Sequence, residues 1–159
     1  MVGLMWDHNE AVMLWHLILA FLLAFVVGFE REIRGAPAGD RTYSLVGTGA
    51  AAITAVTIGP APQAIAGVIT GIGFIGAGFV IHSDMGTLKG ITSAATIFAV
   101  AAIGVVAGSG HTWLAVAITA LVLVDLELRQ VPGLRRFDAR RYVQRVRDDD
   151  AMPGMDDDA

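Results

Sequence analysis

The stretch YSLVGTGAAAITAVTIGPAPQAIAGVITGIGFIGAGFVI, Tyr43 to Ile81, contains no aspartate, glutamate, lysine or arginine. A second uncharged stretch runs from Ile91 to Val124. Mostly apolar runs of about 18 or more residues without charge are typical of helices that cross a bilayer. The composition of the 159-residue chain agrees, because 55% of its residues are hydrophobic and only 16% are charged. The sequence therefore predicts a polytopic membrane protein.

Clusters of turn residues divide this apolar sequence into five candidate spans. Glycine, proline and polar residues form the connections GPAPQ at 59–63 and SGHT at 109–112. The expected spans are 11–29, 43–59, 64–81, 91–108 and 113–128. The predicted fold is thus all-α, a bundle of five transmembrane helices within one domain, residues 1–128. The first ten residues carry no lysine or arginine, so we expect the first helix to be retained rather than cleaved as a signal peptide.

The distribution of basic residues predicts the orientation of the bundle. With the N-terminus outside, the segments 30–42, 82–90 and the tail after 128 are cytoplasmic. These segments contain all eleven lysine and arginine residues, as the positive-inside rule requires. We therefore expect a cytoplasmic C-terminus. Trp15, Trp113 and Tyr43 lie near predicted helix ends, where aromatic rings sit at the level of the lipid headgroups.

The C-terminal tail separates basic from acidic residues. Residues 129–147 carry seven arginines and one acid, and residues 148–159 carry six aspartates and no base. Apolar residues of the basic segment follow a helical i, i+3, i+4, i+7 spacing: Ala139, Tyr142, Val143 and Val146. We expect 129–147 to form a basic amphipathic helix on the anionic inner leaflet. The acidic segment 148–159 has nothing to bury and is expected to be disordered.

The glycine-rich segment at 69–78, ITGIGFIGAG, allows three interpretations. It fits G-x-G-x-x-G, the dinucleotide-binding pattern, but no predicted strand precedes it and no acid follows at the required spacing. The preferred interpretation is a seam of small residues that lets membrane helices approach closely. The residues expected to form this seam are Gly67, Gly71, Gly73, Gly76, Gly78, Gly90 and Thr92. The third interpretation is a helix that breaks at mid-membrane to line a binding site.

Three ordered blocks of sequence resemble one family. GFEREIRGAPAGDRTYSLVGTGAA follows the first span, GIGFIGAGFVI ends the third, and LKGITSAATIFAVAAIGVVAG forms the fourth. Together they are similar to the MgtC/SapB family of bacterial inner-membrane proteins, over about residues 15 to 128. The resemblance implies a five-helix membrane domain, a multi-pass location in the inner membrane, and no catalytic activity. It also implies a role in magnesium limitation or acid stress, for some members by restraining an ion-motive ATPase.

The chain departs from the longer members of that family. Only 31 residues follow Leu128, whereas MgtC-like members often carry a C-terminal ACT-like domain, so this chain resembles the short form. Thr87 stands where asparagine is common, and Asp40 where an apolar residue is common. Functions that need the additional domain are therefore in doubt.

Polar residues gather at the predicted cytoplasmic mouth of the bundle. Glu30 and Arg34 are four residues apart and can pair along one helix. Carboxylates at this end suit hydrated Mg²⁺, while the basic side chains suit an acidic partner. The residues expected to contact a partner or an ion are Glu30, Arg31, Arg34, Gly39, Arg41, Thr42, Lys89 and Asp125.

The sequence offers no catalytic constellation and no dedicated metal site. It has no cysteine, and its four histidines lack metal-ligand spacing. We expect no cofactor other than a possible Mg²⁺, no enzymatic activity and no nucleic-acid partner. The expected function is modulation of an ion-motive ATPase or of ionic homeostasis, in contact with the bilayer and with homo-oligomers allowed. The alternative is a small Mg²⁺ transporter with a broken third helix.

Overall fold

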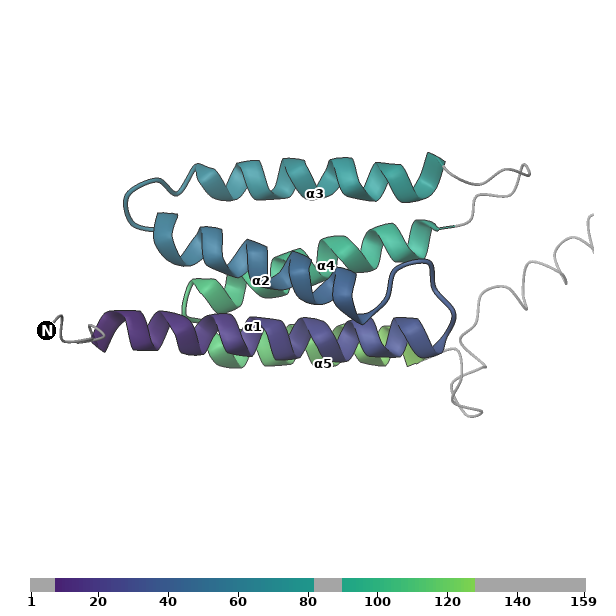
Figure 1. Cartoon of the computed structure of the whole chain (residues 1–159), viewed down its shortest axis with the longest axis horizontal. Coiled ribbons are helices and arrows are strands. Elements are labelled where there is room, and N and C mark those ends of the chain that lie inside the picture. The colour runs from purple at the N-terminus through teal and green to yellow at the C-terminus, as the bar shows by residue number, and fades with distance from the viewer. Residues whose placement is uncertain (1–7, 82–89, 128–159) are drawn as a thin grey trace, which may run out of the picture. The chain divides into compact units, whose positions relative to one another are not determined.

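The computed structural model describes residues 8–81 and 90–127, and every regular element within them is an α-helix. The helices are α1 (His8–Ile33), α2 (Asp40–Thr57), α3 (Ala64–Ile81), α4 (Ile91–Gly108) and α5 (Thr112–Glu127) (Figure 1). The all-α class and the five-helix prediction are confirmed. The predicted bounds 64–81 and 91–108 coincide with those of α3 and α4. The tail segments 129–147 and 148–159 lie outside the described residues.

The chain divides into two compact units, residues 1–123 and 124–159. In the first unit α2 packs extensively against α1 and α4, and α4 also contacts α1 and α3. The contact between α2 and α3 is the least extensive of these. Consequently α1, α2 and α4 form the inner group of helices, and α3 lies at its edge (Figure 1).

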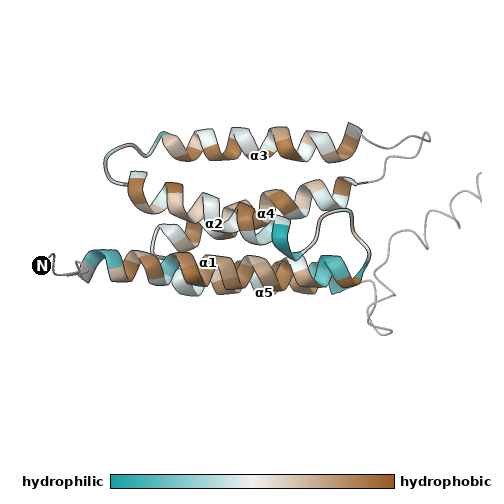
Figure 2. Ribbon diagram, in the orientation of Figure 1, coloured by the Kyte–Doolittle hydropathy of each residue, from teal (hydrophilic) through white to brown (hydrophobic). Residues whose placement is uncertain are grey.

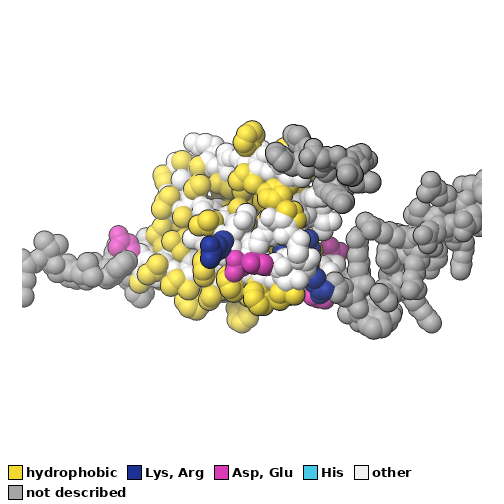
Figure 3. All heavy atoms as spheres, turned by 45° about the vertical axis from the view of Figure 1, so that its right-hand side comes forward, with side chains coloured by type: hydrophobic (Ala, Val, Ile, Leu, Met, Phe, Trp, Pro, Cys, Tyr) yellow, Lys and Arg dark blue, Asp and Glu magenta, His cyan; other side chains and the backbone are white. Residues whose placement is uncertain are grey.

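The apolar residues of these helices cover the surface as well as the interior. Large side chains such as Phe29, Phe74 and Trp113 are exposed, the last two to 83% and 85%. Apolar residues follow each helix in Figure 2, and hydrophobic side chains cover much of the face in Figure 3. Two helices, Asn9–Ile33 and Ile91–Gly108, are long and apolar enough to cross a membrane, and Ala64–Val80 is a shorter apolar helix. An extended apolar surface of this kind is expected where a protein faces lipid. Five crossings and their orientation stay predictions.

The close helix packing is built on glycines of α1, α2 and α4. A Cβ atom added at Gly104 of α4 would collide with the backbone oxygen of Gly47 in α2, and one at Gly108 with the backbone oxygen of Ala51. A Cβ at Gly28 of α1 would lie 2.7 Å from the Cα of Asp40. The three helices approach so closely because no side chain separates their backbones, as membrane helices do at small residues.

The seam predicted from the third span is a different one. Within the described part of the chain, and apart from the adjacent backbone of α3 itself, no atom lies within 4 Å of a Cβ placed at Gly67, Gly71, Gly73 or Gly78. The structure thus gives these four glycines no close neighbour on another helix, and their part in a packing seam between membrane helices stays a prediction. Two predicted positions do have close neighbours: a Cβ added at Gly76 would lie 3.6 Å from Ala94 Cβ, and one at Gly90 would lie 2.6 Å from the Phe79 backbone oxygen. Gly90 has a φ of 97°, a conformation that favours glycine. Thr92 is exposed.

The alternative interpretation, a break in the third helix, is wrong. α3 is continuous from Ala64 to Ile81, because the glycines lie in a helix flanked on both sides by apolar residues that favour the helical state in lipid. No strand precedes it among residues 8–81. The G-x-G-x-x-G pattern therefore lies inside a helix and does not form a dinucleotide-binding turn, which needs a strand before it and a helix start after it.

Candidate functional site

The charged residues at the C-terminal end of α1 form the densest polar cluster of the first unit. Arg34 donates from Nε to Glu30 Oε1 at 3.1 Å, which confirms the pairing expected from their spacing. Arg31 Nη1 lies 3.9 Å from the other carboxylate oxygen of Glu30. The side chains of Glu30 and Arg31 are only 11% and 15% exposed. One carboxylate thus lies between two guanidinium groups in a mostly buried place.

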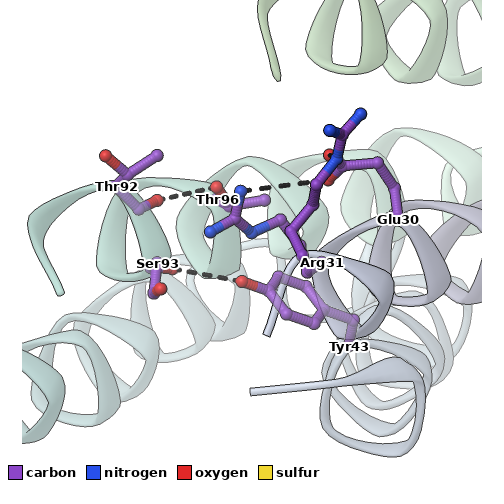
Figure 4. Close-up of polar contacts among 7 residues, drawn as sticks. Glu30, Arg31, Tyr43, Thr92, Ser93 and Thr96 are labelled. Atoms are coloured by element: carbon purple, nitrogen blue, oxygen red, sulfur yellow. Dashed lines mark hydrogen bonds and ion pairs between the residues drawn. The ribbon is translucent and has the colours of Figure 1, made fainter. Parts of the chain in front are cut away.

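Residues of α2 and α4 complete this cluster. The Tyr43 hydroxyl of α2 donates to the backbone oxygen of Ser93 in α4 at 3.4 Å, and it faces the side chains of Arg31 and Thr96. Figure 4 shows Arg31 reaching from α1 toward Thr96. Thr96 itself donates to the Thr92 oxygen at 2.7 Å, within α4. The polar cluster, defined here as Glu30, Arg31, Arg34, Tyr43, Ser93 and Thr96, therefore joins all three inner helices.

The turn between α1 and α2 is arranged by a second carboxylate. Glu32 Oε2 accepts a hydrogen bond from the backbone N–H of Asp40 at 3.1 Å, at the start of α2. This satisfies one of the donors that a helix N-terminus leaves unpaired. A Cβ on Gly39 would lie 2.5 Å from the same oxygen, so glycine makes room for the cap. The side chain of Glu32 fixes the direction in which α2 leaves the turn.

Beside this cap lies an open pocket of about 430 Å³. Its lining combines two carboxylates, one guanidinium and one hydroxyl with apolar residues: Glu32, Ala36, Pro37, Gly39, Asp40, Arg41 and Thr42. Three predicted site residues, Gly39, Arg41 and Thr42, therefore belong to this pocket. The polar cluster takes three others, Glu30, Arg31 and Arg34. The predicted mouth thus separates into a buried network and an exposed turn.

Two predicted site residues are not joined to either group. Lys89 lies outside the described residues. Asp125 is an exposed residue of α5 in the second unit, residues 124–159. Their participation in one site with Glu30 stays a prediction.

Sequence reasoning missed the role of Tyr43. We expected its ring at the level of the headgroups; the side chain is fully buried among the helices, and its depth in the membrane stays a prediction. The reason for its burial is the small residue opposite: a Cβ on Gly28 would lie 2.9 Å from Tyr43 Cβ, so glycine lets the ring enter between helices. A signal existed in the buried series Tyr43, Gly47, Ala50 and Thr54, whose spacing marks one helix face.

The chemistry of the cluster does not suit a bound cation. No group of three or more histidine, cysteine or acidic residues that could hold a metal occurs among residues 8–81 and 90–127. Mg²⁺ takes carboxylate oxygens that keep several waters, whereas the Glu30 carboxylate is already paired with Arg34 and lies near Arg31. Two guanidinium groups around one carboxylate leave a net positive charge, which repels a divalent cation.

A family profile and individual relatives both place this chain in the same family. The profile of the MgtC family matches residues 17–132. An uncharacterized protein of Haemophilus influenzae is 32% identical over 89% of this chain. YhiD of Escherichia coli K12 is 37% identical over 80% of it, and the protein MgtC of Brucella abortus is 38% identical over 77%. No solved structure matches the chain at a significant level.

The matches cover only part of each relative. The chain spans 64%, 65% and 53% of the lengths of the Haemophilus, Escherichia and Brucella proteins. The residues matched by the family include α1 from residue 17 and all of α2 to α5, with the polar cluster, the α1–α2 turn and the glycine packing of the inner helices. The family match covers well over half of the sequence, and its position agrees with the three blocks quoted above. This chain belongs to the MgtC family.

Proposed function

We propose that this chain is a non-enzymatic, multi-pass protein of the bacterial inner membrane that modulates an ion-motive ATPase and thereby magnesium-related ionic homeostasis. The observation that supports the proposal most is the pairing of Glu30 with Arg34 and Arg31. A carboxylate held in this way joins packed helices and is already engaged by guanidinium groups. It therefore favours a structural role at a docking end over the passage of a cation.

The turn between α1 and α2 offers the contact surface for that partner. Arg41 is exposed and lines the open pocket with Thr42. The Glu32 cap holds this turn against the end of α1, so the surface is ordered before a partner arrives. Preorganised surfaces lose less conformational entropy on binding. This order and the exposed guanidinium of Arg41 support docking of the ATPase at the α1–α2 turn.

A second candidate function comes from the relatives. YhiD of Escherichia coli carries a name that proposes magnesium transport. For this chain the corresponding candidate is a small Mg²⁺ transporter. The continuous α3 and the engaged Glu30 carboxylate weigh against it, because each was expected to take part in the ion path.

Two measurements separate these functions. Inverted membrane vesicles, with and without the chain, report ATP-driven proton pumping, and proteoliposomes report Mg²⁺ flux. We expect the chain to lower pumping and to conduct no Mg²⁺. Arg41→Glu, which reverses the charge at the turn, should relieve most of the inhibition.

The control is Phe74→Leu, an apolar exchange on the exposed face of α3, which should inhibit like the parent. Protein-dependent Mg²⁺ flux that Glu30→Gln abolishes would establish the transporter instead. Equal pumping with and without the chain, together with no flux, would remove both candidates.

A further inference from the structure

Two charged atoms of the polar cluster are buried without a partner. Glu30 Oε2 and Arg31 Nε are shielded from solvent, and neither has a hydrogen-bond partner among the described residues. The other carboxylate oxygen of Glu30 is occupied by Arg34. The nearest approach to Oε2 is Arg31 Nη1 at 3.9 Å, which is too long for a hydrogen bond. The atoms lie where α1 meets α2 and α4.

Buried polar atoms of native proteins almost always bond to protein or to ordered water. When a buried charged atom lacks such a bond, nothing compensates the free energy of its desolvation. Here one atom is an acceptor and the other a donor, on adjacent residues of one helix. A single neutral molecule that both donates and accepts can satisfy the two together.

We infer that the junction of α1, α2 and α4 is a binding site for a buried water molecule. Water needs two to four polar partners to occupy such a place. Glu30 Oε2 accepts its hydrogen, Arg31 Nε donates to its oxygen, and the Tyr43 hydroxyl oxygen supplies a further acceptor, since its own hydrogen goes to Ser93.

The charges around this place decide the class of ligand. A cation meets the guanidinium groups of Arg31 and Arg34, and an anion meets the carboxylate of Glu30. A cation is thus repelled by the guanidinium groups, and an anion next to Oε2 is repelled by the carboxylate. A neutral molecule can donate a hydrogen bond to the carboxylate and accept one from Arg31 Nε. This inference concerns the internal hydration of the cluster and does not depend on the proposed function.

X-ray hydroxyl-radical labelling of the full chain in nanodiscs tests the site, because radicals formed from an internal water modify its neighbours. Labelling is read as the ratio between folded and unfolded protein, after rapid mixing into water enriched in oxygen-18. Tyr43 and Ile97 are both fully buried. We expect the folded-to-unfolded labelling ratio of Tyr43 to be several-fold higher than that of Ile97. The oxygen atom added to Tyr43 should be oxygen-16, the isotope of the original solvent.

A pair of variants assigns the label to the cluster. Arg31→Met removes the donor and should reduce Tyr43 labelling several-fold, whereas Arg31→Lys keeps a donor and should retain it. Helix content by circular dichroism checks that both variants fold. Protection of Tyr43 equal to that of Ile97 in the parent protein overturns the inference, whatever the variants do. Unchanged Tyr43 labelling in folded Arg31→Met overturns it as well.

Discussion

Single glycines determine how closely the inner helices of this protein approach. Gly104 contacts the α2 backbone so tightly that a Cβ would collide with the Gly47 oxygen, while Gly71 of α3 has open space. The same chemical change should therefore have opposite effects at the two sites. Gly104→Ala forces α4 away from α2 and should destabilise the bundle by about 1–3 kcal/mol, as overpacking does.

Gly71→Ala is the matched comparison. It adds a methyl group where nothing collides, and alanine favours a helix over glycine by about 0.8–1.0 kcal/mol. Its stability should equal or exceed that of the parent. Thermal unfolding in detergent measures both variants. Destabilisation by Gly71→Ala as large as that by Gly104→Ala would mean that the α3 glycines pack against a surface outside the described residues.

The Glu32 cap gives a second prediction for a single residue. Glu32→Ala removes the acceptor for the Asp40 N–H and should cost about 0.5–2 kcal/mol, as the loss of other helix caps does. Hydrogen exchange at the first turn of α2 should accelerate, while exchange in α4 stays unchanged. Gly39→Ala, which pushes against the same carboxylate, should act in the same direction. Unaltered exchange in both variants would show that the cap is not needed.

At the scale of the element, the exposed apolar face of α3 gives a test of membrane insertion. Phe74 is 83% exposed at the middle of α3, so in a bilayer it faces lipid. Phe74→Arg places a charge at membrane depth, at a cost of about 2.5–3.5 kcal/mol on insertion scales. We expect this variant to integrate poorly, while Phe74→Leu integrates normally. Protease protection of α3 in membranes measures the difference, and equal protection would place this face outside the lipid.

Helix positions were predictable because the apolar stretches end at charged or turn residues. The bounds of α3 and α4 came directly from that rule. α1 extends from His8 to Ile33, beyond the predicted 11–29, because polar residues at both ends continue the helix and hydropathy does not register them. The predicted start of α2 at 43 was late for the same reason, since Asp40 and Arg41 belong to its first turn.

The candidate site was predictable only where it is local. The Glu30–Arg34 pair follows from a spacing of four residues. The contact between Tyr43 and Ser93 joins helices that are 50 residues apart in the chain, and it exists because Gly28 leaves room for the ring. The glycine pattern in the sequence does not distinguish Gly71, which has space for a side chain, from Gly104, which packs against the α2 backbone. Those differences arise from the packing of whole helices.

At the scale of the whole molecule, the arrangement of the first unit leads to a topology test. The α2–α3 and α4–α5 connections lie at the same end as the start of α1, and the α1–α2 turn lies at the opposite end (Figure 1). The parent has no cysteine, so single cysteines report cleanly. Cysteines at Gln63 and His111 should react with an impermeant thiol reagent added to intact cells, while one at Pro37 should not. Labelling at Pro37 alone would invert the predicted orientation.

The place of α2 between α1 and α4 has a consequence for biosynthesis. Domains form in the order in which the ribosome supplies their parts. The α1–α2 pair can assemble as soon as both helices have emerged, but the glycine-lined side of α2 has no neighbour until α4 arrives. During that interval α3 is already made, yet it offers little contact to α2. Until α4 has been synthesised, the α1–α2 pair in the nascent chain therefore leaves the α4-facing side of α2 unpacked and accessible to other proteins.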